Sequence, residues 1–172
     1  MQTSEQNIQE EQIGQDTLSK KLVIVRELNA PVEMVWKAWT EEKHYRKWWG
    51  PENYSCPYCK IDLRVGGKYL FCMLSPKGNE YWTTGEYLEI EAPVKLVYTD
   101  SFSDKNGNKL PPPSEVSASY MPGKIKVTVL LLEKKGRTIM TLIHEGIPEG
   151  EMKQMAERIW NEAFDKMEAS FK

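Results

Sequence analysis

The stretch that decides the fold is residues 148–172, PEGEMKQMAERIWNEAFDKMEASFK. Apolar side chains recur along it at three- and four-residue spacing, which is the period of one helix face. This stripe consists of Met152, Met155, Ala156, Ile159, Trp160, Ala163, Phe164, Met167 and Phe171. Charged side chains occupy most of the other positions. We therefore predict a long C-terminal helix whose apolar stripe covers one face of a sheet.

The chain before this helix changes its hydrophobic period towards two between residues 54 and 144, which is typical of strands. Turn signals at Gly66-Gly67, Ala92-Pro93 and Lys134-Lys135-Gly136 divide this region into hairpins. Gly66-Gly67 predicts a two-residue turn, which would place Cys72 opposite Ile61.

The N-terminal half opens with a β-branched run at residues 21–28, which predicts a strand. Two short helices follow, the first from Val32 to Trp39 and the second from Thr40 to about Trp48. Strands grouped together with helices at the ends indicate an α+β fold. We predict a curved antiparallel sheet of six or seven strands wrapped around the C-terminal helix.

Residues 1–18 have a different composition from the rest of the chain. They hold six Gln or Asn residues and four acidic residues, with few apolar side chains. Such a segment buries too little apolar surface to offset the entropy of ordering it. We therefore predict a disordered tail at 1–18 and one folded domain at 19–172.

Composition excludes several functional classes. Lys and Arg total 23 and Asp and Glu total 25, a net charge of −2, whereas nucleic-acid-binding surfaces are strongly basic. No apolar run approaches the roughly 20 residues of a membrane helix. The N-terminus lacks a signal peptide and there are three cysteines, so we predict free thiols in the cytoplasm.

Several motifs together identify a family resemblance. They are Ala30–Trp36, Trp48-Trp49-Gly50-Pro51, Asp62–Tyr69, Gly85-Glu86-Tyr87, Val127-Thr128-Val129 and His144-Glu145-Gly146. Over residues 20–172 the chain resembles the family related to the activator of the 90-kDa heat-shock protein ATPase, within the START-like (SRPBCC) superfamily. The resemblance implies a helix-grip fold and a hydrophobic pocket between the sheet and the last helix. It also implies a possible chaperone partner, although residues 1–18 are too short to supply the separate N-terminal domain of the co-chaperone that names the family.

Cys56-Pro57-Tyr58-Cys59 has the spelling of a dithiol redox site. Redox cysteines of that type sit at a helix N-terminus, whereas a strand is predicted here, so we expect structural thiols. A zinc site needs about four ligands. Cys56, Cys59 and Cys72 supply three, so they remain weak metal candidates and we predict no metal or cofactor.

The predicted pocket has mainly apolar walls with a few polar groups, as small-molecule sites do. Its expected lining residues are Asp62, Arg64, Tyr69, Phe71, Trp82, Tyr98, Phe102, His144, Met152, Met155, Ile159 and Trp160. His144 with Glu145 is also a conceivable acid–base pair, although a structural histidine at the strand–helix corner is the simpler interpretation.

Three functional hypotheses follow. The first is a module that binds a small hydrophobic or aromatic ligand. The second is a chaperone-associated protein-binding adaptor, which requires a contiguous apolar patch outside the pocket. The third is a cyclase- or hydrolase-type enzyme that brings Asp62, Arg64 and His144 together; without a nucleophile motif we assign no catalytic residue. We expect a monomer or a weak dimer.

Overall fold

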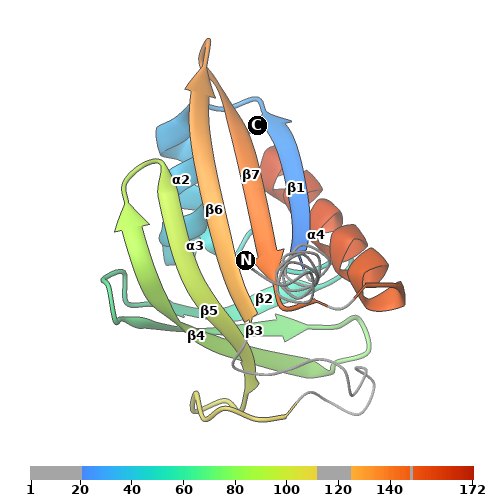
Figure 1. The fold of residues 1–172 in the computed structure, drawn as a ribbon. Coiled ribbons are helices and arrows are strands. Elements are labelled where there is room, and N and C mark those ends of the chain that lie inside the picture. Colours follow the sequence, from blue (N-terminus) through green and yellow to red (C-terminus); the bar gives the residue numbers. More distant parts are fainter. Residues whose placement is uncertain (1–20, 112–124, 148) are drawn as a thin grey trace, which may run out of the picture.

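The computed structural model describes residues 21–111, 125–147 and 149–172 (Figure 1). The predicted tail at 1–18 lies outside the described residues. The strands are β1 (Lys21–Leu28), β2 (Ser55–Ile61), β3 (Lys68–Leu74), β4 (Glu80–Glu91), β5 (Lys95–Ser103), β6 (Ile125–Lys134) and β7 (Arg137–Glu145). The helices are α2 (Val32–Thr40), α3 (Glu42–Tyr45) and α4 (Glu151–Ser170). The predicted order of elements is confirmed.

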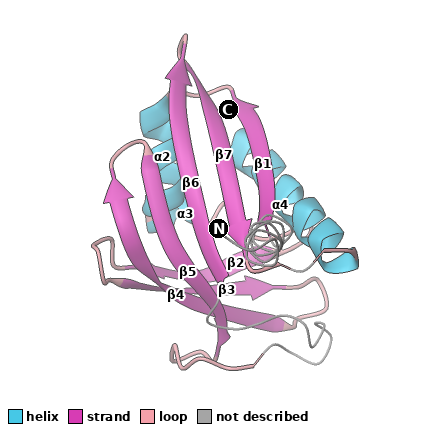
Figure 2. Ribbon diagram, viewed as in Figure 1, coloured by secondary structure: helices cyan, strands magenta, loops and turns pink. Residues whose placement is uncertain are grey.

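All seven strands form one antiparallel sheet in the order β1-β7-β6-β5-β4-β3-β2. The first strand thus joins the sheet beside the last one, and β2 forms the opposite edge. The sheet curves, so that β2 and β3 run across the ends of the longer strands, and the helices lie on one face (Figure 2). This arrangement confirms the predicted α+β helix-grip fold.

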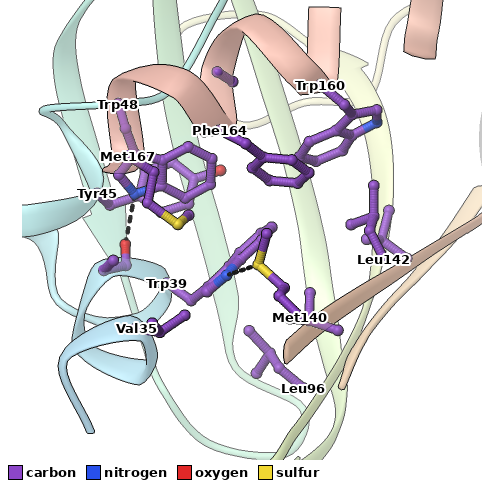
Figure 3. Packing of buried hydrophobic residues seen from close by; sticks show 14 of the residues in the cluster. Val35, Trp39, Tyr45, Trp48, Leu96, Met140, Leu142, Trp160, Phe164 and Met167 are labelled. Atoms are coloured by element: carbon purple, nitrogen blue, oxygen red, sulfur yellow. Dashed lines mark hydrogen bonds between the residues drawn. The ribbon is translucent and has the colours of Figure 1, made fainter. Parts of the chain in front are cut away.

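The core lies between the inner face of the sheet and the helices (Figure 3). Trp39 of α2 lies at its centre, where its indole N–H donates to Met140 Sδ at 3.3 Å. Trp48 donates from its indole N–H to the carbonyl of Ala38 at 2.8 Å. Phe164 of α4 packs edge-on against Trp39 with ring centroids 6.0 Å apart. These aromatic contacts hold α2, α4 and the loop after α3 in one unit.

Only part of the predicted apolar stripe of α4 is buried. Trp160, Ala163, Phe164 and Met167 are buried, whereas Met155 is 47% exposed. A helix turns about 100° per residue, which places Met155 roughly 180° from Phe164. The inward orientation predicted for Met155 is therefore wrong.

The two-residue turn predicted at Gly66-Gly67 is also wrong. Ile61 pairs with Tyr69, so residues 62–67 form a six-residue loop between β2 and β3. This loop hydrogen bonds to the next strand, because Gly66 N–H donates to the carbonyl of Tyr87 and Tyr87 N–H donates to that of Gly67, each at 2.9 Å. The real register places Cys72 opposite Tyr58 and not opposite Ile61.

Candidate functional site

An aromatic cage lies on the inner face of the sheet, where β3, β4 and β5 meet α2 and α3. We define this aromatic cage as Trp39, Tyr45, Tyr69, Phe71, Tyr87, Leu96 and Tyr98. Tyr69 and Phe71 are two residues apart on β3, so they share a face, and their rings stack with centroids 4.4 Å apart. Tyr87 lies directly opposite Tyr98 in the ladder. Strand alternation therefore builds most of the cage.

The cage encloses little empty space. About 10 Å³ is open to the centre of a water molecule, which is room for about one water. Tyr45 fills much of the remaining volume, because its ring stacks on Phe71 at 4.2 Å. The cage is therefore a nearly packed core with polar atoms inside it, and any larger occupant has to displace side chains.

The tyrosine hydroxyls of the cage fall into two groups. Tyr69 Oη lies 2.7 Å from the carbonyl of Thr99 and 2.8 Å from Asp100 Oδ1. Tyr45, Tyr87 and Tyr98 make no side-chain hydrogen bond within the part of the chain that the structure describes. Burial raises the pKa of all four hydroxyls, so they remain protonated donors at neutral pH. The cage thus offers hydrogen-bond donors that the described residues leave unused.

Asp100 borders this group as the next inward residue of β5 after Tyr98. Burial raises the pKa of its carboxyl group to about 6, although hydrogen bonds from the Tyr69 hydroxyl and the Ser101 backbone lower it. The side chain therefore changes charge close to neutral pH.

His144 lies on β7 under α4. Trp160 donates from its indole N–H to His144 Nδ1 at 3.0 Å, which leaves the imidazole proton on Nε2. His144 Nε2 is buried and has no hydrogen-bond partner among the described residues. Burial lowers the pKa of His144 to about 4, so the ring is neutral at pH 7.

The structure brings only some of the predicted pocket residues together. Tyr69, Phe71 and Tyr98 belong to the aromatic cage. His144 and Trp160 form a separate hydrogen-bonded pair. Phe102, Met152 and Ile159 are partly buried, and Met155 is exposed. Trp82 lies on the other sheet face, where its ring contacts Tyr58 at 5.4 Å.

Asp62 and Arg64 are not in the interior. Both belong to the exposed loop 62–67, where Arg64 Nε lies 2.9 Å from Asp62 Oδ2. Exposed ion pairs of this kind contribute little to stability. His144 is buried under α4, so the structure does not assemble the three polar groups of the enzyme hypothesis.

Sequence reasoning missed Trp39, Tyr45, Tyr87 and Leu96 as cage residues. Strand alternation could have identified Tyr87 and Leu96, since Tyr87 shares a face with Gly85 and Leu96 shares one with Tyr98. Trp39 and Tyr45 come from separate helices, and no local pattern predicts which strands those helices contact.

The outer face of the sheet carries a second feature, which we name the outer patch. It consists of Val23 and Val25 on β1, Ile139 and Ile143 on β7, and Leu130 and Leu132 on β6. The ladder brings these side chains together, because Val23 pairs with Ile143, Ile139 pairs with Leu132, and Val25 and Leu130 flank Thr141 between them. Val25 is 62% exposed and Leu132 63% exposed.

Charged pairs frame the outer patch at both ends. At one end Lys21 and Lys126 both contact the carboxylate of Glu145, at 3.6 and 3.3 Å. At the other end Arg137 Nε lies 3.1 Å from Glu27 Oε1. The described helices lie on the opposite face of the sheet and leave this surface open (Figure 2). None of them combines the length and the hydropathy of a membrane-spanning helix.

Comparison with known proteins identifies the family. Solved structures of similar fold include a protein of Arthrobacter aurescens, with 28% identity and a TM-score of 0.74 over 90% of this chain and 87% of that one. A protein of Chromobacterium violaceum has 26% identity and a TM-score of 0.70 over 87% of this chain and 95% of that one. A Silicibacter pomeroyi protein described as AHSA1 shares the fold at 20% identity and a TM-score of 0.68, over 88% and 96% of the two chains. A search of curated proteins gives no match. The model of the Activator of Hsp90 ATPase homolog 1-like family matches residues 29–172, and the chain belongs to that family.

Proposed function

We propose that this domain is a protein-binding module and that the outer patch is its binding surface. The observation that carries this proposal is the contiguity of six aliphatic side chains on three hydrogen-bonded strands. Soluble proteins rarely leave such patches open unless a partner covers them. The strands hold the side chains rigidly, so little conformational entropy is lost on binding.

The charged pairs at the two ends of the outer patch would orient a partner bound on it. Lys21, Lys126 and Glu145 at one end and Glu27 with Arg137 at the other form a polar rim around an apolar centre, as in protein interfaces. The family description names the Hsp90 ATPase. An Hsp90-type chaperone is therefore the first partner to test.

The chain offers a matched pair of variants for this test. Val25 lies in the outer patch and Val65 in the loop 62–67, and they are 62% and 65% exposed. Val25→Lys should weaken binding to purified Hsp90 at least about tenfold in calorimetric titration, whereas Val65→Lys should bind like the wild type. Equal affinities of the two variants would contradict the proposal for the patch. If the wild type itself does not bind, the chaperone is the wrong partner.

A second candidate function is binding of a small aromatic ligand in the aromatic cage. The hydroxyls of Tyr45, Tyr87 and Tyr98 favour it, because they donate no hydrogen bond to the described residues and can donate to an acceptor on a ligand. With room for about one water, the ligand has to displace a ring such as Tyr45 to enter.

Fluorescence tests this second function directly. A phenol- or naphthalene-class probe that enters the cage should change the emission of Trp39, which lines it. Tyr98→Phe should weaken the binding because it removes one donor while keeping the ring, and Trp82→Phe on the other face is the control. Native mass spectrometry that finds no retained molecule, together with unchanged emission, would leave the outer patch as the remaining candidate.

A further inference from the structure

Cys56 and Cys59 lie three residues apart on β2, and a regular strand would point them to opposite faces. The structure places both on the inner face because β2 has a bulge. Ser55 pairs with Leu74 but Tyr58 pairs with Cys72, so one extra residue is inserted between them. Pro57 lies within this insertion, where its missing N–H costs no ladder hydrogen bond. Cys56 and Cys59 are 6% and 8% exposed, and Tyr58 between them points outward.

The two thiols lie on the inner face of β2 on either side of the bulge. In the thiol form, Cys56 Sγ donates to the carbonyl of Tyr58 at 3.3 Å. The Cys59 thiol donates a hydrogen bond to Cys56 when Cys56 is ionised; this bond, with Arg46 and Lys166 nearby, lowers the pKa of Cys56. The same bond and burial raise the pKa of Cys59. Cys56 is thus the sulfur favoured as the nucleophile, and Cys59 keeps its proton.

The two cations near Cys56 contact backbone carbonyls. Lys166 Nζ of α4 contacts backbone carbonyls, those of Gly50, Pro51 and Tyr54 at 3.0–3.1 Å. Arg46 donates to the carbonyl of Pro57 in the bulge. Neither forms an ion pair with a carboxylate of the described residues. Their charge therefore remains available to stabilise a thiolate at Cys56.

We propose that Cys56 and Cys59 form a peroxide-reactive dithiol, in which Cys56 is oxidised first and Cys59 resolves it to a disulfide. The Cys56 thiolate attacks one oxygen of hydrogen peroxide and the O–O bond breaks, which gives Cys56 sulfenic acid and, with one proton, water. The Cys59 sulfur then attacks the Cys56 sulfur, and the hydroxyl leaves as water with the Cys59 proton. Two thiols and one peroxide thus become one disulfide and two waters.

The burial of the pair selects the oxidant. As residues, Cys56 and Cys59 are only 6% and 8% exposed, which disfavours a bulky disulfide such as oxidised glutathione and favours an oxidant as small as hydrogen peroxide. Cys72 provides an internal comparison. It is also buried, but it lies on the outer face between Tyr58 and Trp82, and burial raises its pKa to about 11.

The experiment uses the full chain, reduced and then treated with hydrogen peroxide. Intact mass should show loss of two hydrogens, and peptide mapping should locate the disulfide at 56–59. Cys72→Ser should behave like the wild type. Cys59→Ser should stop at a sulfenic acid on Cys56, seen as the gain of one oxygen in the intact mass, and Cys56→Ser should react at least about tenfold more slowly.

A second pair of variants tests the role of charge. Arg46→Met should move the pH profile of Cys56 oxidation by hydrogen peroxide to higher pH, whereas Arg46→Lys should restore it because it keeps the charge. Near-UV circular dichroism verifies that each variant is folded. The proposal is overturned if a folded Cys72→Ser protein forms no disulfide, or if Cys72 reacts with peroxide as fast as Cys56.

Discussion

Asp100 and His144 both lie on the inner face of the sheet, and burial moves their pKa values in opposite directions, to about 6 and about 4. As pH rises from 3.8 to 6, the unfolded chain loses the Asp100 proton before the folded chain does, so the free energy of unfolding falls. As pH falls from 6.5 to 4, the unfolded chain protonates His144 first, so the free energy of unfolding falls again. Between pH 4 and 6 the two slopes oppose each other.

Replacing Asp100 should leave only the pH dependence of the unfolding free energy that His144 causes. Relative to the wild type, Asp100→Asn should gain up to about 2 kcal/mol of unfolding free energy between pH 4 and 6, allowing for the partial exposure of Asp100. Urea denaturation at a series of pH values measures this difference. Asp104→Asn is the control, because hydrogen bonds in the exposed turn lower the pKa of Asp104 below this range. If the difference in unfolding free energy between Asp100→Asn and the wild type stays constant with pH, the raised pKa of Asp100 is contradicted.

Gly85 makes the Tyr69–Asp100 contact possible. A Cβ at this position would lie 1.8 Å from the carbonyl oxygen of Thr99 and 2.7 Å from Tyr69 Oη. Gly85→Ala should therefore separate β4 from β5 and cost about 3 kcal/mol in the free energy of unfolding. Gly78→Ala, at a turn position with open space around it, should cost only about 1 kcal/mol of backbone strain. Equal losses in thermal denaturation would show that close approach is not the cause.

Among the elements, α4 contributes four buried side chains to the core, namely Trp160, Ala163, Phe164 and Met167. Ala163 is buried on the face that carries Phe164, whereas Ala156 is only partly buried. Ala163 is 1% exposed, so a larger ring at this position has to displace its neighbours in the core. Ala163→Trp should destabilise the domain by about 1–3 kcal/mol in urea unfolding, and Ala156→Trp by clearly less. If Ala163→Trp keeps full stability, the core contains more space than the structure shows.

The sequence predicted the type of every element but not every register. The tight turn at 134–136 is confirmed, because Lys135 and Gly136 both have positive φ, as a two-residue hairpin needs. Gly66-Gly67 carries the same signal, yet backbone bonds from the loop to Tyr87 favoured a longer connection. The bulge at Pro57 could not be predicted from the sequence either, because it depends on how β2 pairs with the partner strand β3. Asp62 and Arg64 were therefore predicted to line the pocket although they lie in the exposed loop 62–67, and Cys72 was placed opposite Ile61 although it pairs with Tyr58.

For the whole molecule, the sequence predicted the helix-grip architecture because motif order and hydrophobic period agree on it. The functional surface was harder to predict. Alternation in β1, β6 and β7 is apolar on both faces, so the pattern alone does not tell the inner face from the outer. Only the position of α4 decides that Leu142 is buried while Ile143 faces outward.

The final prediction concerns residues 1–18 and the outer patch together. Their Gln-rich, acidic composition argues that they add little apolar burial, so deleting them should change the melting temperature by less than about 2 °C. Differential scanning calorimetry of the full and shortened chains measures this change. A loss of several degrees would show that the segment docks on the domain. In that case Val25→Lys in the full chain should cause a similar loss, because the outer patch begins beside Lys21, where the segment joins β1. If deletion costs stability but Val25→Lys does not, the segment binds elsewhere, and the outer patch stays open for a partner.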